Sequence, residues 1–268
     1  MFRRRFSISG TWQNLTAWLG LLLMIGSFAW WQLSTPPMVT TSARPPIVPP
    51  PVTLVVLDPG HGGQDSGAMC GSILEKDLTL DVAQRVDRLL QAEGTATLMT
   101  RNGDNYVSLA DRAALGNRAQ DCIFVSIHFN EGNKNTSAGV ETYYAEHQMP
   151  AIPQLASWLP FLQRASLETP DIESQSLAEF IQEALVARTQ AVNRGTKAEQ
   201  FFVITNVRHP AVLVEGGFLT NNEDIAKLAS EDYREQMAAG IAEGILHYRD
   251  VIKQRQVTLA ADHKLGPE

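Results

Sequence analysis

Three apolar segments of this 268-residue sequence each end in a residue that can bind a metal ion or move a proton. Asp58 and His61 follow the first segment, VTLVVLDPGHGG. His128 lies near the end of the second, CIFVSIHFN, and Glu215 near the end of the third, AVLVEGG. Two histidines and one carboxylate are a recurrent ligand set of catalytic zinc, which leaves the fourth position for water. These residue types indicate a metal-dependent hydrolase.

Taken singly, most of these residues have a plainer explanation. His61 stands in the glycine-rich stretch PGHGG, where a histidine is often structural or exposed. Glu75 opens an expected helix, where the helix dipole alone favours an acid. His128 shares its expected strand face with Phe124, so it could be a core histidine. Glu215 differs, because a carboxylate within an apolar strand is costly unless it is paired or functional.

The surrounding sequence predicts a single α/β domain with a mostly parallel, twisted sheet flanked by helices. Short runs rich in Val, Ile and Leu without clean alternation are typical of strands buried on both faces. We expect strands at 52–57, 96–100, 122–128, 139–144 and 211–215, with a weaker one at 201–204, and helices at 77–93, 108–120, 176–190 and 231–252. Strands that alternate with helices imply a parallel sheet covered on both faces. Ser108 is the candidate N-cap of the second helix.

This fold brings the candidate residues together. Ligands of open α/β sheets bind outside the carboxyl ends of the strands. His61, His128 and Glu215 all follow or end expected strands, and we therefore expect them at one edge of the sheet. A second carboxylate at that edge has a role, since it can accept the proton of a metal-activated water.

The N-terminal 51 residues differ from the rest in composition. Three arginines at positions 3–5 precede an apolar stretch from about Leu15 to Leu33 that is flanked by tryptophans. About 20 apolar residues span a bilayer, and the arginines favour an inward N-terminus. We expect a cytoplasmic segment at 1–14, an uncleaved transmembrane anchor at 15–33 and a Pro-rich linker at 34–51. The alternative is a signal peptide that is cleaved after export.

The remaining chain is expected to comprise a catalytic domain at 52–252 and a tail at 253–268. Hydrophobic residues make up 44% and charged residues 19%, as in ordinary globular proteins. The net charge of −7 argues against nucleic acid as a partner. Cys70 and Cys122 are expected to be reduced, although export would permit a disulfide. Residues 146–173 interrupt the alternation with Pro-broken amphipathic pieces and suggest a lid or binding loop.

At these residues the chain resembles the zinc-dependent N-acetylmuramoyl-L-alanine amidases of the type-3 fold, which cut peptidoglycan. The resemblance covers about Val52 to Tyr248 apart from the insertion. It rests on the motifs LDPGHGGQDSGA, EKDLTLDVA, MTRNGDNYVSLADRAALGNRA, SIHFN, GVETYY, NRGTK and RHPAVLVEGGFLTNNED. In the third motif the signature positions are Thr100, Arg101, Asp104, Ser108, Leu109, Arg112 and Asn117.

The resemblance implies that His61, Glu75 and His128 hold Zn²⁺ and that Glu215 is the general base. The substrate would be the amide between N-acetylmuramic acid and L-alanine, and the domain would act outside the cytoplasmic membrane. Some relatives carry an insertion at a similar point that blocks the cleft until a partner moves it, so 146–173 could respond to an activator protein.

Several features leave alternatives open. Phe129 stands where a small residue is usual, Ser66 replaces a frequent proline, and Gly216 replaces an apolar residue, which affects substrate preference more than activity. Arg194 and Lys197 could position anionic peptide groups or lie on a solvated face. Another zinc amide hydrolase that cuts the stem peptide, or an inactive wall-binding regulator, are the rival functions.

Overall fold

A computed structural model describes residues 18, 23–27, 30, 51–132, 135–148 and 171–264. The chain divides into two compact units, residues 1–47 and 48–268. In the first unit, Trp18, residues 23–27 and Trp30 are helical. Within the described ranges, no helix is long and apolar enough to cross a membrane. Most of the expected anchor at 15–33, and nearly all of the expected linker at 34–51, lie outside those ranges.

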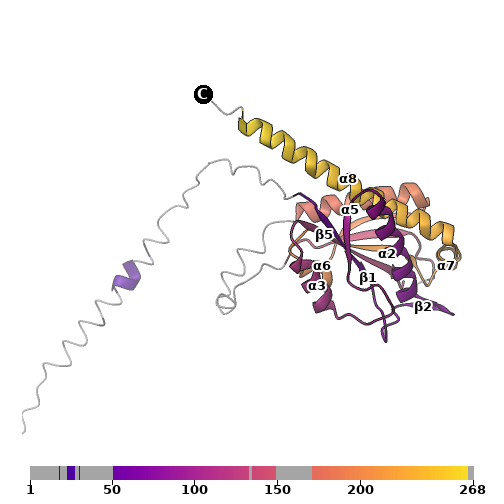
Figure 1. The fold of residues 1–268 in the computed structure, drawn as a ribbon. Helices are drawn as coiled ribbons and strands as arrows, with labels where there is room; N and C mark the ends of the chain where they lie inside the picture. The colour runs from indigo at the N-terminus through magenta and orange to yellow at the C-terminus, as the bar shows by residue number, and fades with distance from the viewer. Residues whose placement is uncertain are drawn as a thin grey trace, which may run out of the picture. The chain divides into compact units, whose positions relative to one another are not determined.

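The second unit is built on a six-stranded sheet with the strand order β4-β1-β5-β8-β6-β7. Figure 1 shows strands β1 and β5 of this sheet among the helices. The strands are β1 (Leu54–Pro59), β4 (Ala96–Met99), β5 (Cys122–Asn130), β6 (Val140–Tyr144), β7 (Asn193–Ala198) and β8 (Ala211–Phe218). Neighbouring strands are parallel except β6 and β8, which are antiparallel. The carboxyl ends of β1, β5 and β8 therefore meet the amino end of β6 at one edge.

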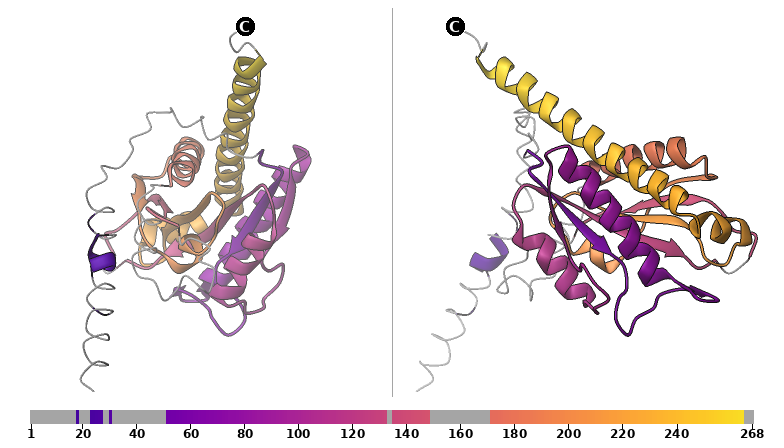
Figure 2. Two further views of the ribbon diagram at one scale, coloured as in Figure 1. Left: turned by 90° about the vertical axis from the view of Figure 1, so that its left-hand side faces the viewer. Right: turned by 45° about the vertical axis from the view of Figure 1, so that its right-hand side comes forward.

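Helices pack on both faces of this sheet. The larger core joins one face to α2 (Glu75–Ala92), α5 (Ile172–Thr189) and α8 (Glu231–Lys264). The smaller core joins the other face to α3 (Leu109–Arg118) and α6 (Phe202–Thr205). The C-terminal part of α8 extends beyond the sheet (Figure 2). This arrangement confirms the expected α/β fold with a mostly parallel sheet.

The helices α5 and α8 approach one another closely because α8 carries glycines at the contact. A Cβ atom on Gly244 would lie 2.5 Å from the Cα of Ile181, and one on Gly240 would lie 2.8 Å from the Cα of Leu185. Backbone atoms cannot move aside as a flexible side chain can. The small-residue positions therefore set the distance between these two helices.

Five of the six expected strands are confirmed, but the weaker strand expected at 201–204 is wrong. Residues 202–205 form α6, whose Val203 and Ile204 are buried in the smaller core. The sixth strand is instead β7, which the sequence analysis did not predict. Its sequence NRGTKA is polar and only partly buried, because β7 lies at the edge of the sheet. Polar edge strands lack the apolar pattern on which strand prediction depends.

Helix boundaries also differ from expectation. Ser108 does cap α3, since its Oγ accepts a hydrogen bond from the Asp111 N–H. α5 begins at Ile172, earlier than expected, and α8 continues to Lys264. The short helix α7 (Asn222–Leu228) was not predicted. Of the expected insertion at 146–173, residues 149–170 lie outside the described ranges.

A small hairpin separates the first two candidate ligands along the chain. It consists of β2 (Met69–Cys70) and β3 (Ile73–Leu74), and α2 starts directly after it. Cys70 on this hairpin and Cys122 at the start of β5 are both free thiols, as expected. Burial raises the pKa of the Cys122 thiol to about 11. The hairpin thus returns the chain from the His61 loop to Glu75.

Candidate metal centre and active site

Three of the predicted site residues converge at the carboxyl ends of β1 and β5. The possible ligand atoms of His61, Glu75 and His128 all lie within 4.8 Å of one another. His61 Nε2 and His128 Nδ1 each lie 3.0 Å from Glu75 Oε1. Two ligands about 2.0–2.1 Å from a tetrahedral zinc ion stand about 3.3 Å apart. The donor set and its spacing therefore fit a zinc ion.

Glu75 is held as an ionised carboxylate. Its Oε2 accepts a hydrogen bond of 2.8 Å from the Ala68 N–H, and its Oε1 accepts one of 3.0 Å from the Phe129 N–H. Burial opposes ionisation, but the hydrogen bonds and charges of His128 and His61 outweigh it and hold the pKa of Glu75 far below its usual range. A buried carboxylate in this state is ready to bind a cation.

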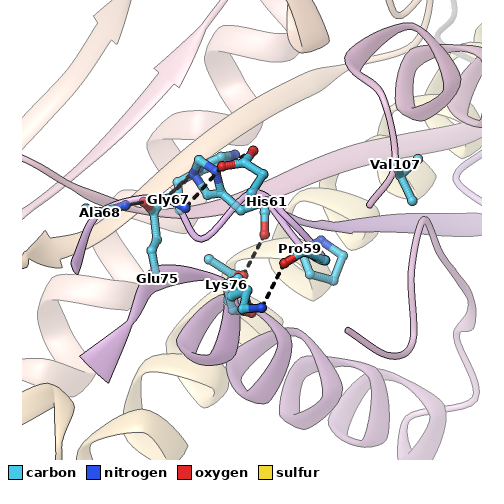
Figure 3. Close-up of polar contacts among 12 residues, drawn as sticks. Pro59, His61, Gly67, Ala68, Glu75, Lys76 and Val107 are labelled. Atoms are coloured by element: carbon cyan, nitrogen blue, oxygen red, sulfur yellow. Dashed lines mark hydrogen bonds and ion pairs between the residues drawn. The ribbon is translucent and has the colours of Figure 1, made fainter. Parts of the chain in front are cut away.

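His61 is oriented by a carboxylate that the sequence analysis did not single out. Its Nδ1 lies 2.9 Å from Asp65 Oδ2, which leaves Nε2 directed at Glu75. Burial lowers the pKa of His61, but Glu75 and Asp65 outweigh it and raise that pKa overall. Metal-binding histidines commonly donate their second N–H to such a carboxylate. In the sequence, the role of Asp65 was indicated only by its place four residues after His61 in the motif LDPGHGGQDSGA. Figure 3 shows His61, Gly67, Ala68 and Glu75 gathered at this point.

Glycines make room for the converging side chains. A Cβ on Gly60 would lie 2.3 Å from Cε1 of the His128 ring. A Cβ on Gly67, whose φ is +63°, would lie 2.4 Å from Glu75 Oε2. His61 itself has a φ of 59°, an uncommon conformation for a residue other than glycine. Such backbone strain tends to occur at functional sites.

Asp58 does not join the metal group, contrary to the expectation that it could bind metal or move a proton. It is fully buried, and its Oδ1 accepts hydrogen bonds of 2.7 Å from Arg112 Nη1 and 2.6 Å from Thr100 Oγ1. Its Oδ2 accepts a bond of 2.8 Å from Ser126 Oγ. Both carboxylate oxygens of Asp58 thus accept hydrogen bonds from neighbouring side chains. These bonds fix the loop that follows Asp58 to the sheet.

Two arginines hold the loop that carries His61. Arg101 and Arg112 are each only 3% exposed. Arg112 donates to the carbonyl oxygens of Pro59, His61 and Val107, residues labelled in Figure 3. Arg101 donates to the carbonyl oxygens of Pro59 and Gly60. The signature residues of this motif therefore position the loop.

Glu215 lies beside the metal group on the neighbouring strand. It pairs with His128 in the β5–β8 register, and both side chains lie on the sheet face of the smaller core. Its Oε2 is shielded from solvent and has no hydrogen-bond partner among the described residues. Burial raises the pKa of Glu215 well above its usual range, and the charges of Glu75 and Glu141 raise it further. Both effects favour the protonated form of this carboxyl group when no metal ion is bound.

The strand next to β8 carries the central residue of a charged cluster. This residue, Glu141, was not identified as a site residue from the sequence. Glu141 on β6 pairs with Glu215 across the sheet. It accepts hydrogen bonds from Arg194 and Lys197, the two residues considered as substrate-positioning cations. Burial opposes ionisation of Glu141, but Lys197, Tyr143 and Arg194 keep its pKa below the usual range. The signal for Glu141 was its place in the motif GVETYY.

Sequence comparisons relate this chain to known amidases. The sequence model of the N-acetylmuramoyl-L-alanine amidase family (Amidase_3) matches residues 55–247. N-acetylmuramoyl-L-alanine amidase LytC of Bacillus subtilis is 36% identical over 194 residues, which are 72% of this chain and 35% of LytC. This chain therefore spans about a third of that relative.

Solved structures extend the similarity to the fold. An N-acetylmuramoyl-L-alanine amidase from Clostridium difficile 630 has a TM-score of 0.63 and 33% identity, covering 74% of this chain and 97% of that one. The CwlD amidase of Clostridioides difficile, solved in complex with the GerS lipoprotein, has a TM-score of 0.63 and 26% identity, covering 74% and 99%. The match over residues 55–247 spans more than half of the sequence, and the chain belongs to the N-acetylmuramoyl-L-alanine amidase family.

Proposed function

We propose that this protein hydrolyses the amide bond between N-acetylmuramic acid and L-alanine in peptidoglycan, using a zinc ion held by His61, Glu75 and His128. The observation that carries the proposal is the convergence of those three side chains next to the shielded carboxyl group of Glu215. Membership of the amidase family supplies the substrate class.

The chain's own residues divide the chemical work as follows. His61, Glu75 and His128 bind the ion, and Asp65 keeps the His61 ring oriented. When bound, zinc supplies Lewis-acid polarisation of the scissile carbonyl and a more acidic water. Glu215 accepts the proton of the attacking water and then donates it to the leaving amine of L-alanine. Its place beside the three ligands and its carboxyl oxygen without a hydrogen-bond partner among the described residues suit both transfers, because that oxygen is left for the proton.

Digestion of purified sacculi tests this function. Zinc-loaded protein is expected to release new L-alanine amino groups, and chelation of the metal is expected to abolish the release. New amino groups within the peptide would indicate a peptidase instead. Binding to sacculi without any cleavage would indicate a wall-binding regulator.

The place of action follows from the N-terminal sequence. The apolar stretch at 15–33 anchors the protein in the cytoplasmic membrane as a single span, and the arginines before it keep the first residues inside. The catalytic domain then lies on the outer side of that membrane. Full-length protein should sediment with membranes and lose its catalytic domain to external protease. A mature N-terminus near Arg44 would show a cleaved, secreted form.

Residues 146–173 act as a lid that an activator protein displaces. Their sequence combines prolines with apolar residues, and they directly follow β6, which carries Glu141. The CwlD amidase, a relative of this chain, was solved in complex with a lipoprotein. That complex supports the proposal that this chain also has a protein partner. A lid that covers the metal centre in most molecules slows hydrolysis in proportion, because substrate binds only the open fraction.

A further inference from the structure

A second charged cluster lies on the sheet face that carries Glu215. Its centre is Glu141, which is only 1% exposed. Glu141 Oε1 accepts hydrogen bonds of 2.9 Å from Asn130 Nδ2 and 2.7 Å from the Tyr143 hydroxyl. Its Oε2 accepts bonds of 2.7 Å from Arg194 Nε and 2.5 Å from Lys197 Nζ. One buried carboxylate thus fixes two cationic side chains.

The cluster stands in line with the metal centre. His128 pairs with Glu215, and Glu215 pairs with Glu141, across three neighbouring strands. Residues paired directly across strands point to the same side of a sheet. Adjacent strands are about 4.8 Å apart, so Glu141 lies roughly 10 Å across the sheet from His128. A substrate bound at the metal can therefore reach the cluster along this row.

The two cations retain capacity to bind an anion. Arg194 and Lys197 together carry two positive charges against the single negative charge of Glu141. Their side chains are 32% and 38% exposed, so their heads reach solvent. Among the described residues, Arg194 donates its hydrogen bond through Nε, and neither of its Nη nitrogens donates to a protein acceptor. Both of those nitrogens and part of the Lys197 ammonium group remain available to a ligand.

Ring contacts further restrict where these cations can point. The Arg194 guanidinium lies 4.8 Å from the centre of the Phe218 ring, and Lys197 Nζ lies 5.5 Å from that of Tyr143. Pre-positioned charges lose less conformational entropy when they bind than free side chains do. The arrangement is therefore a preformed pair of donors beside the active site.

We propose that Arg194 and Lys197 form a subsite for a carboxylate on the peptide side of the substrate, with Glu141 as the positioning residue of both. This rests on the proposed amidase function. The carboxyl group of N-acetylmuramic acid is consumed in the scissile amide, so the N-acetylated glycan side offers no carboxylate there. The peptide side does carry carboxylates, and these are the anions that the subsite can select.

The span between the two sites indicates which carboxylate fits. The carboxyl group of L-alanine is consumed in the bond to the second residue, so L-alanine offers no free carboxylate beside the scissile nitrogen. An extended chain advances about 3.3–3.6 Å per residue, so two residues cover about 7 Å and the acidic side chain of the second residue covers the rest of the roughly 10 Å. The subsite therefore favours substrates with a free carboxylate at the second residue over the carboxamide.

Two matched muramoyl peptides test the subsite. Both are N-acetylmuramoyl-L-alanyl compounds with a second acidic residue, one with its carboxylates free and one with them amidated. Their affinities are measured by calorimetry on zinc-loaded, full-length Glu215→Gln protein, and their turnover on the wild type. We expect the free acid to bind about tenfold more tightly, as one charge-assisted contact of about 1.4 kcal/mol gives.

Substitution of the cations separates binding from a purely structural role. Arg194→Met and Lys197→Met should each remove most of that preference by raising the KM for the free acid, while kcat and the KM for the amide change little. Arg188→Met is the matched control, because Arg188 pairs with Glu243 on an exposed surface of the helices. Arg188→Met should leave KM and kcat unchanged for both peptides.

The outcomes distinguish this proposal from the function on which it rests. Equal affinity for the two peptides with normal cleavage would overturn the subsite and leave the amidase function intact. Equal losses for both peptides in the Arg194 and Lys197 variants would likewise reduce the cluster to a structural role. A tenfold preference in binding without any cleavage by the wild type would support the subsite and contradict the amidase reaction. Failure to bind either peptide would overturn both.

Discussion

At the residue scale, Glu215 combines shielding from solvent with two nearby negative charges, and both favour its protonated form. The Glu215→Gln variant cannot accept a proton from water. We expect it to fold and bind zinc normally but to lose roughly 10²–10⁴-fold in kcat on sacculi, the usual contribution of a general base. Near-normal turnover by this variant would show that another group is the base.

The same substitution has a second, thermodynamic consequence. The pKa of Glu215 is higher in the folded than in the unfolded state, so the unfolded chain releases its proton first as pH rises. Wild-type stability is therefore lost between the usual carboxyl range and the raised folded-state pKa. In metal-free protein, Glu215→Gln should raise the melting temperature by a few degrees at about pH 7 and little at about pH 4. The exposed Glu183→Gln serves as the control and should show no such pH-dependent gain.

Asp65 offers a second test at this scale. Its carboxylate faces His61 Nδ1, so Asp65→Asn should loosen the ring without removing a metal ligand. Loss of such a partner typically costs 10–100-fold in metal affinity. Competition with a chelator of known affinity measures this effect, with Asp250→Asn on the exposed part of α8 as the control. An unchanged zinc affinity would mean that Asp65 does not orient the ligand.

At the element scale, the α5–α8 contact is fixed by glycines, and the distance between helices should be sensitive to one methyl group. Gly244→Ala places a Cβ 2.5 Å from the Ile181 Cα. Overpacking costs about 1–3 kcal/mol, which the better helix propensity of alanine offsets by at most about 1 kcal/mol. We expect net destabilisation in chemical denaturation.

A matched glycine provides the control for that measurement. At Gly103 the nearest atom to an added Cβ is Asn105 Oδ1 at 3.7 Å, an ordinary contact. Gly103→Ala should therefore leave stability unchanged or slightly increased. If both variants behave alike, close helix packing is not what Gly244 provides.

The secondary-structure elements differ in how well the sequence predicts them. The strands that carry His128 and Glu215 were predictable, because their largely apolar segments of nine and eight residues are longer than the four-residue segment of α6. β7 was not, because an edge strand buries little and its sequence NRGTKA is polar. Residues 202–205 were misassigned because short apolar runs suit a buried helix turn as well as a strand.

The site was predictable to a similar extent. The ligands and Glu215 stood in recognisable motifs, whereas the role of Asp58 depended on tertiary contacts. Its partners Arg112 and Ser126 lie far from it in sequence, and only the fold brings them together. Asp65 and Glu141 were visible in the motifs, but their hydrogen-bond partners were not.

At the scale of the whole molecule, residues 146–173 are proposed to form a lid that slows hydrolysis until an activator protein displaces it. Replacing residues 148–172 with a short Gly/Ser loop should raise hydrolysis of sacculi by the wild-type site. The replacement should have no effect in the Glu215→Gln background, which controls for altered wall binding. Unchanged activity in a folded, zinc-loaded replacement would remove the lid from the account.

The location of the metal tests the central claim most directly. Anomalous diffraction at the zinc absorption edge, from crystals of zinc-loaded protein, identifies the ion and its ligands together. We predict one dominant peak about 2.0–2.2 Å from nitrogens of His61 and His128 and from a Glu75 oxygen, with Glu215 facing the ion but not bound to it. Zinc at another group of side chains in an active enzyme, with none at this centre, would contradict the account.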